Sequence, residues 1–208
     1  MRHYLLVFLL TAAAPAWAQG TLIDNPRVTA TKVRLAPDRP YTTDRHTQDA
    51  VLLIAGDGRI ATDGKSADRH FGDAIFIPAG KQVTEEVEGD AAITLVEVVL
   101  KDSRPPHPNI TGYPLGFPRP GAKNTLNNNR AAVWVYTWGP HETTPMHYHD
   151  KDIVGVFRYD GPLKSTDEKG KSTIIRYQAG EVRFTPGDRS HREGLVSGRQ
   201  SAILMELK

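Results

Sequence analysis

Three histidines in the C-terminal part of the chain have the spacing of a metal site. His147 and His149 are separated by one residue, so on an extended segment their side chains point to the same side of a sheet. His191 follows a later segment, 180–186, which we predict to be a strand ending in a Pro-Gly turn. Three neutral imidazoles leave coordination positions open for water or substrate, as catalytic metal sites do. The alternative is a polar strand edge at His147 and His149 and a surface histidine at His191.

These two segments resemble the two motifs of the cupin superfamily. His147-x-His149 is similar to the first motif, and Gly180-x5-Pro186 with His191 five residues further on is similar to the second. The resemblance implies a β-barrel of the jelly-roll type that binds one divalent transition metal ion. Imidazole ligands suit Zn, Fe, Mn, Ni and Cu alike, so the identity of the metal stays open.

The chain departs from the family pattern at the fourth metal ligand. Cupins usually carry a glutamate four or five residues beyond the second histidine, where this chain has Ile153 and Val154. Asp152 lies one residue short of that window, and on a strand such a shift turns a side chain to the opposite face. A metal held by three neutral imidazoles keeps its full positive charge, so we expect it to attract anionic molecules.

Three further side chains are candidates for a catalytic role. Glu142 and Glu193 lie close in sequence to the histidines and could transfer a proton or replace the missing ligand. Arg158 has the same strand parity as Val154 and could therefore point inward. The alternatives are loop positions for both glutamates and a solvated, outward position for Arg158.

A second copy of the motif region lies in the N-terminal part. Gly72–Pro78 has the same Gly-acid-x-x-Phe-x-Pro form as 180–186 and lies 108 positions earlier, while 44–51 aligns with 147–154 at an offset of 103. We therefore predict two similar units, 27–100 and 126–208. The connection between them, 101–125, is rich in proline and is not expected to form a regular element.

The two copies differ at the three positions that are predicted to bind the metal in the second copy. In this alignment His147 corresponds to Asp44, His149 to His46, and His191 to Val83. The N-terminal copy therefore keeps one imidazole of three, and we expect it to be a degenerate, structural unit.

Composition and turn signals favour an all-β protein with two cupin-like double-stranded β-helix (jelly-roll) barrels in tandem. The 208 residues include 39% hydrophobic residues, 24% charged residues, 18 Gly and 15 Pro. Short runs rich in β-branched and aromatic residues alternate with Gly, Pro and Asp turns. Within 131–138, Trp134, Tyr136 and Trp138 share one face, which is either core or the mouth of the metal pocket.

The N-terminus predicts export. Arg2 precedes an apolar run from Tyr4 to Leu10, and Ala16-Trp17-Ala18 has the small-x-small pattern of a cleavage site, so we interpret residues 1–18 as a signal peptide. The mature chain would then be periplasmic or secreted and would not be an integral membrane protein. The alternative is an uncleaved signal anchor. The chain contains no cysteine, so disulfides do not contribute to its stability.

Together these features predict an exported metal-binding cupin protein that acts on a small oxygenated or anionic organic molecule by oxygenation, isomerisation or lyase chemistry. The alternative is a non-catalytic protein of the same fold that binds a small molecule or a metal. A net charge of +2 gives no reason to expect nucleic acid as a partner. A homodimer is an open option.

Overall fold

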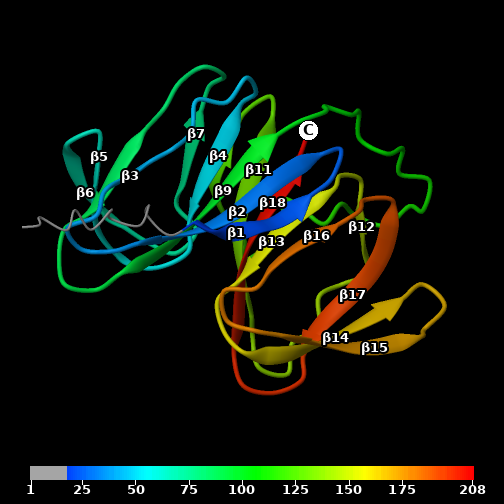
Figure 1. The fold of residues 1–208 in the computed structure, drawn as a ribbon. Helices are drawn as coiled ribbons and strands as arrows, with labels where there is room; N and C mark the ends of the chain where they lie inside the picture. The colour runs from blue at the N-terminus through cyan, green and yellow to red at the C-terminus, as the bar shows by residue number, and fades with distance from the viewer. Residues whose placement is uncertain (1–17) are drawn as a thin grey trace, which may run out of the picture.

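The computed structural model describes residues 18–208, and these form 18 strands joined by turns and loops (Figure 1). The signal-peptide prediction for 1–18 lies outside the described residues except for Ala18. Within the described range, no helix has the length and apolarity needed to cross a membrane.

The N-terminal half contains nine strands in two sheets. The larger sheet has the order β1-β2-β9-β4-β7 and the smaller one the order β3-β8-β5-β6. The strands are β1 (Ala18–Asp24), β2 (Val28–Leu35), β3 (Tyr41–Thr42), β4 (Ala50–Ile54), β5 (Gly58–Thr62), β6 (Lys65–Arg69), β7 (Ala74–Ile77), β8 (Thr84–Val87) and β9 (Ile93–Leu100).

The C-terminal half repeats this arrangement. Its larger sheet has the order β10-β11-β18-β13-β16 and its smaller one the order β12-β17-β14-β15. The strands are β10 (Lys123–Asn127), β11 (Ala131–Trp138), β12 (His147–His149), β13 (Ile153–Phe157), β14 (Gly161–Asp167), β15 (Ser172–Tyr177), β16 (Val182–Thr185), β17 (Arg189–Leu195) and β18 (Gln200–Leu207).

The two Gly-acid-x-x-Phe-x-Pro segments occupy equivalent places, which confirms the predicted repeat. Phe76 on β7 pairs with Val51 on β4, and Phe184 on β16 pairs with Val154 on β13. Both phenylalanines pack against the same apolar cluster. The tandem all-β architecture predicted from the sequence is therefore present.

Three apolar clusters form the core of the protein, and one of them joins the two halves. One fills the N-terminal barrel and one the C-terminal barrel, around residues such as Leu52 and Phe157 respectively. The third lies between the two larger sheets and takes side chains from both, including Val51 and Val98 of one half and Val154 and Met205 of the other. Figure 1 shows these sheets side by side in the middle of the molecule, with the smaller sheets toward its opposite ends.

This packing explains the sequences of the central strands. β4 (AVLLI) and β13 (IVGVF) are buried at every residue, because one face of each strand lines its own barrel and the other contacts the opposite half. A short, continuous apolar run is typical of a strand covered on both faces. By contrast, β5, β6 and β8 carry polar residues on their outer face, so their sequences contain no continuous apolar run.

The connection between the halves is partly ordered along the second barrel. Leu115 forms a parallel bridge with Tyr148, and the amide of Gly116 donates to the carbonyl of Tyr148 over 2.8 Å. The segment thus extends the smaller C-terminal sheet beside β12. Its neighbour Phe117 is buried in the barrel core, so the connection forms part of the wall of the barrel.

Candidate metal centre

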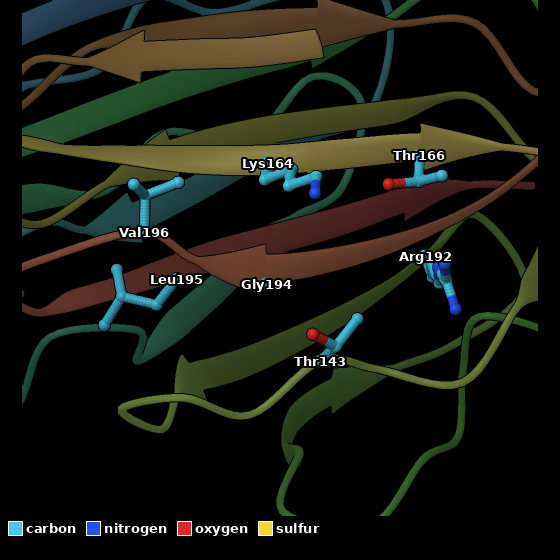
Figure 2. A pocket seen from close by; sticks show the side chains of 7 residues that line it. All are labelled: Thr143, Lys164, Thr166, Arg192, Gly194, Leu195 and Val196. Carbon is cyan, nitrogen blue, oxygen red and sulfur yellow. The ribbon is translucent and has the colours of Figure 1, made fainter. Parts of the chain in front are cut away.

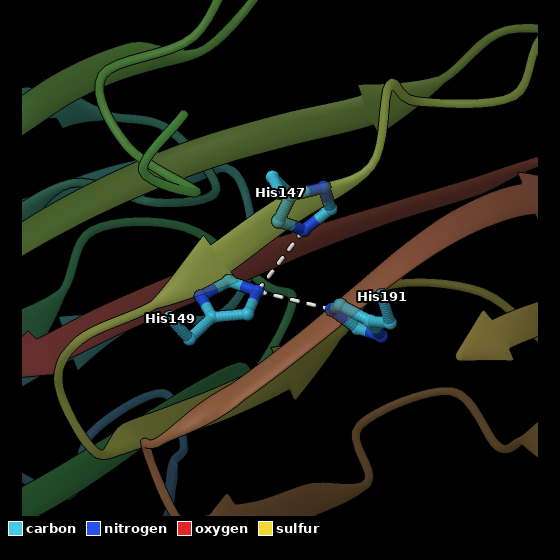
Figure 3. A group of neighbouring side chains, drawn as sticks. All are labelled: His147, His149 and His191. Atoms are coloured by element: carbon cyan, nitrogen blue, oxygen red, sulfur yellow. Dashed lines mark hydrogen bonds between the residues drawn. The ribbon is translucent and has the colours of Figure 1, made fainter. Parts of the chain in front are cut away.

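His147, His149 and His191 converge in the C-terminal barrel (Figure 3). His147 and His149 lie on β12, and His191 lies opposite His147 on the paired strand β17. Strand alternation sends all three side chains to the inner face, where each is at most 4% exposed. The Nε2 atom of His149 lies 3.1 Å from the Nε2 atoms of both His147 and His191.

These separations fit a single metal ion. Nitrogen ligands at the usual 2.0 to 2.1 Å from a tetrahedral metal are about 3.3 Å apart. The three histidines are the one group of at least three His, Asp or Glu residues within 18–208 whose ligand atoms lie close enough to hold a metal. They can therefore hold one metal ion, whose identity the three imidazoles leave undetermined.

The protein keeps the three rings neutral, as metal ligands must be. Burial lowers the pKa of His147 to about 4 and the pKa of His191 to about 3. Burial also holds the pKa of His149 well below its usual value, and the neighbouring histidines add to this effect. At neutral pH each ring therefore has one nitrogen lone pair available.

Hydrogen bonds orient two of the rings. The Nδ1–H group of His147 donates to the carbonyl oxygen of Pro145 over 2.8 Å, which leaves Nε2 free to bind a metal. The Nδ1 atom of His191 lies 2.9 Å from the hydroxyl oxygen of Ser165, which can accept a hydrogen bond from the Nδ1–H group. The Nδ1 atom of His149 is buried without such a partner, and this ring is positioned by packing.

Gly116 provides the room for the ring of His149. A Cβ atom on Gly116 would lie 2.5 Å from Cε1 and 2.7 Å from Nδ1 of His149, which is too close for real contacts. A side chain at residue 116 would therefore displace the imidazole. The ordered part of the connection thus shapes the metal site directly.

Two guanidinium groups lie beside the histidines. Arg119, from the connection, places Nη1 3.5 Å from Nε2 of His147 and its Cζ atom 3.8 Å from the ring centroid of Tyr136. Arg189 precedes His191 by two residues on β17 and so faces the same interior. Burial lowers the pKa of both guanidinium groups, and their Nε atoms are buried without a hydrogen-bond partner.

A small cavity of about 30 Å³ adjoins these groups, which is roughly the share of one water molecule in the liquid. Its lining combines the charged residues with aromatic and apolar ones: Arg119, Trp138, His149, Ile153, Gly155, Phe157, Tyr177, Arg183, Thr185, Arg189, Glu193 and Leu204. Glu193 is the one acidic residue among them. Arg183 is paired with Glu181, so Glu193 faces two guanidinium groups, Arg119 and Arg189, that form no ion pair with a carboxylate within residues 18–208.

The other side chains singled out from the sequence lie in different places. Glu193 lines the cavity, and its carboxylate is 3.8 Å from Nδ1 of His191. Glu142 is exposed on the turn after Gly139. Arg158 points away from the histidines and forms an ion pair with Asp57 of the N-terminal half.

Asp152 does not replace the missing glutamate ligand. It accepts a hydrogen bond from Nε of Arg27 over 2.8 Å and another from the amide of Gly187 over 2.9 Å. The Arg27–Asp152 pair is buried and joins the two halves. Both Asp152 and Arg158 therefore serve the contact between halves.

Sequence reasoning missed Arg119 and Arg189. Arg189 could have been found, because it shares strand parity with His191. Arg119 lies among prolines in the connection, where no periodicity indicates its direction. The face formed by Trp134, Tyr136 and Trp138 serves both of the roles considered for it, since it packs into the barrel core while Trp138 also lines the cavity.

The N-terminal barrel has no corresponding histidine cluster among its described residues. Nε2 of His46 is 3.1 Å from a carboxylate oxygen of Glu97, and the hydroxyl of Tyr41 donates to the other carboxylate oxygen over 2.7 Å. Val83, at the position of His191, packs against the apolar core. This copy therefore uses its one inward imidazole in a hydrogen-bonded network.

Comparison with solved structures relates this architecture to known proteins. A cupin 2 conserved barrel domain protein from Leptotrichia buccalis is 19% identical and superposes with a TM-score of 0.57, over 96% of this chain and 93% of that one. A variant of oxalate decarboxylase from Bacillus subtilis is 13% identical with a TM-score of 0.61, over 88% and 69%. The chain has a bicupin fold.

A third solved structure matches over nearly the whole of both chains. AerE from Microcystis aeruginosa is 12% identical with a TM-score of 0.61, over 91% of this chain and 96% of that one. No protein-family model and no curated protein sequence matches the chain. At these identities the likeness establishes the fold, and the chemistry has to be argued from the site itself.

Proposed function

We propose that this protein binds one divalent transition metal ion through His147, His149 and His191 and acts on a small anionic organic molecule bound beside it. A divalent metal at this site would supply a Lewis acid that polarises an oxygen of the substrate. The single observation that carries the anionic character of the substrate is the pair of guanidinium groups, Arg119 and Arg189, that border the cavity next to the histidines.

The charges around the cavity do not balance without an anion. Arg119 and Arg189 contribute two positive charges to a largely buried site, and Glu193 contributes one negative charge. A metal ion on three neutral imidazoles would add two more positive charges. Burying a cation without a partner costs free energy. A carboxylate placed between the two guanidinium groups would accept charge-assisted hydrogen bonds from both of them and offset that cost. A carboxylate-bearing substrate would supply that partner.

The remaining side chains suggest how such a substrate would be held. Arg119 and Arg189 would bind and orient its carboxylate, and Trp138 and Phe157 would exclude water from the cavity. Glu193 is the group that would accept or donate a proton, because its carboxylate faces the same cavity. Oxygenation, isomerisation and lyase reactions all remain candidates for the chemical step.

Oxalate is a useful first ligand to test, because the solved oxalate decarboxylases share the fold and oxalate is a small dicarboxylate that suits two guanidinium groups. Binding of oxalate, formate and acetate would be measured by calorimetry on metal-loaded protein. We expect Arg119→Gln and Arg189→Gln each to weaken binding at least tenfold, with the exposed Arg176→Gln as the matched control. Equal affinities in all four proteins would refute the proposed anion site.

The second candidate is non-catalytic binding of a metal or a small molecule. The observation that favours it is the small volume of the cavity, which leaves little room for a substrate to rearrange. Metal analysis of the purified protein, followed by mass spectrometry of the anions incubated with the Zn, Fe, Mn, Ni and Cu forms, separates the two. A new product identifies an enzyme, and retention of unchanged ligand identifies a binding protein.

We also propose that the mature chain starts at Gln19 and is exported to the periplasm or beyond, on the basis of the apolar run and Ala16-Trp17-Ala18. N-terminal sequencing of the protein from its native host tests this. The expected result is a soluble chain that begins at Gln19. Membrane-bound material with an intact Met1 would contradict it.

A further inference from the structure

The smaller C-terminal sheet carries a hollow on its outer face, the face turned away from the histidines (Figure 2). The hollow has a volume of about 340 Å³, which lies in the range of small-molecule sites. Its lining residues are Thr143, Lys164, Thr166, Arg192, Gly194, Leu195 and Val196.

Gly194 creates the hollow. In the sheet, Gly194 on β17 lies between Lys164 on β14 and Thr143, with which it forms an isolated bridge. Because glycine has no side chain, the space between Lys164 and Thr143 on the outer face of the sheet stays open. A Cβ atom on Gly194 would lie 2.8 Å from the hydroxyl oxygen of Thr143, so even alanine would force Thr143 to move.

The hollow is positively charged. Lys164 and Arg192 stand at its border, and no acidic residue lines it. Within residues 18–208, neither cation takes part in an ion pair with a carboxylate. Thr143 and Thr166 add hydroxyl groups, and Figure 2 shows them among the same side chains as the two cations. Cations and hydroxyls around one hollow are suited to an anionic group.

The other end of the hollow is apolar. Leu195 and Val196 line it; the side chain of Val196 is exposed, and that of Leu195 also packs against the core of the C-terminal barrel. In Figure 2 these two residues lie together, on the far side of Gly194 from Arg192. A ligand that satisfies both ends therefore needs an anionic head and a short apolar chain.

The N-terminal half lacks these features at the equivalent positions. The offsets of the repeat relate Lys164 to Ala61 and Gly194 to Glu86, and the structure pairs Ala61 with Glu86 just as it pairs Lys164 with Gly194. The C-terminal half therefore has a lysine paired with a glycine, whereas the N-terminal half has a neutral alanine paired with a glutamate. The basic hollow is thus a property of the C-terminal half and not of the fold.

We propose that this hollow binds a small organic anion with a short apolar chain, such as an alkyl carboxylate, at a site separate from the metal centre. Lys164 and Arg192 hold the charged head, the threonine hydroxyls donate to it, and Leu195 and Val196 contact the chain. The site is back to back with the metal centre, because Ser165 and His191 face inward from the same two strands.

The probe is hexanoate, titrated into the full-length mature protein and followed by calorimetry. Lys164→Gln/Arg192→Gln is expected to weaken hexanoate binding at least tenfold, and raising the salt concentration is expected to weaken it in the wild type, because exposed charges are screened. Lys169→Gln, on the exposed turn after β14, is the matched control and is expected to bind as the wild type does. Hexylammonium has the same chain with the opposite charge and is expected not to bind.

Variants of the metal centre separate this site from the proposed function. His147→Ala and Arg119→Gln alter the metal and anion sites inside the barrel but leave the hollow intact, so hexanoate should bind these variants with unchanged affinity. Hexanoate binding that disappears in them, that persists in Lys164→Gln/Arg192→Gln, or that is absent from the wild type at millimolar concentration would each overturn the proposal. The affinity of oxalate for Arg119→Gln tests the metal-side proposal independently.

Discussion

The two barrels place different side chains at the same interior positions. His149 and His46 are equivalent, but His149 has two imidazoles as neighbours whereas His46 contacts a carboxylate, Glu97. Strand register makes Leu204 the equivalent of Glu97. Glu97 pairs with Leu52, Leu204 pairs with Gly155, and Leu52 and Gly155 are related by the offset of 103. In the N-terminal barrel the inward polar groups thus hydrogen-bond to one another. In the C-terminal barrel the Nε2 atoms of the histidines remain available to bind a metal.

The outer faces differ in a parallel way. Both larger sheets bury their outer faces against each other and carry apolar residues there. Within residues 18–208 the smaller sheets have no such partner, and their outer faces diverge, with Lys164 and Gly194 in one half and Ala61 and Glu86 in the other. In a duplicated scaffold, the surfaces that hold the halves together stay alike, while the free inner and outer faces can acquire separate functions.

The largest effect is expected from His149→Ala compared with His46→Ala. Loss of a ligand should lower metal affinity by more than about a hundredfold, because removal of an outer-shell partner alone costs ~10- to 100-fold. His147→Ala and His191→Ala should behave in the same way. His46→Ala should leave the metal content unchanged, since Val83 occupies the place of the third imidazole. Elemental analysis after dialysis measures all four variants.

If metal persisted in the three C-terminal variants, the histidine cluster would be a packing feature, and the distinction between a metal-binding and a degenerate barrel would fail. If metal were lost from His46→Ala as well, the two halves would share the binding.

The second effect concerns the contact between halves. Asp152→Ala removes one partner of a buried ion pair and leaves Arg27 buried without a carboxylate, which should lower the free energy of unfolding by about 3 kcal/mol. Metal content should stay at the wild-type level, because Asp152 points away from the histidines. Asp24→Ala breaks an exposed pair with Lys101 and should leave the free energy of unfolding nearly unchanged, because water and salt screen that pair. Urea denaturation gives both values, and a loss of metal in Asp152→Ala would show that the carboxylate acts as a fourth ligand.

These two comparisons also show what the sequence could and could not predict. The repeat and the histidine cluster were accessible because Gly-acid-x-x-Phe-x-Pro and His-x-His are short local patterns with a fixed strand parity. The central strands were accessible because burial on both faces makes them continuously apolar. The ion pairs of Asp152 and Arg158 could not be predicted, because their partners, Arg27 and Asp57, lie more than a hundred residues away in the sequence.

The role of the connection was also hidden. Its prolines indicate an irregular segment, and nothing in its local pattern shows that Gly116 and Arg119 return to the metal site. This return is decided by pairing with β12, a tertiary interaction. Sequence reasoning thus finds sites built on regular strands more easily than sites completed by loops.

The third effect is a pH response of the N-terminal half. Glu85 is fully buried, one of its carboxylate oxygens has no hydrogen-bond partner, and burial raises its pKa to about 7 from 4.5. Between these values the native protein holds a proton that the unfolded chain has released, so the free energy of unfolding falls as the pH rises. Glu85 alone should contribute a loss of roughly 3 kcal/mol between pH 4.5 and pH 7.5.

Glu85→Gln should abolish this loss, and Glu86→Gln, at the exposed neighbouring position, should retain it. Urea denaturation of metal-free protein at a series of pH values measures the three slopes. In that protein the histidine cluster should act in the opposite direction, because lowered pKa values make stability rise with pH up to about 6.5. Parallel profiles for the wild type and Glu85→Gln would rule out Glu85 as the source.

The smallest effect is expected from Ser165→Ala. This variant compares His191, whose ring is oriented by a hydrogen bond, with His149, whose ring is not. The hydroxyl of Ser165 lies 2.9 Å from Nδ1 of His191, and a carboxylate oxygen of Glu193 lies 3.8 Å from the same nitrogen. Losing the closer partner should lower metal affinity about tenfold, since outer-shell hydrogen bonds fix the ring and its tautomer. Ser172→Ala, on the outer face of β15, is the matched control and should have no effect on the metal. An unchanged affinity in Ser165→Ala would mean that Glu193 moves in to accept the hydrogen bond from Nδ1–H of His191, and the double variant Ser165→Ala/Glu193→Gln should then show the loss that the single variant did not.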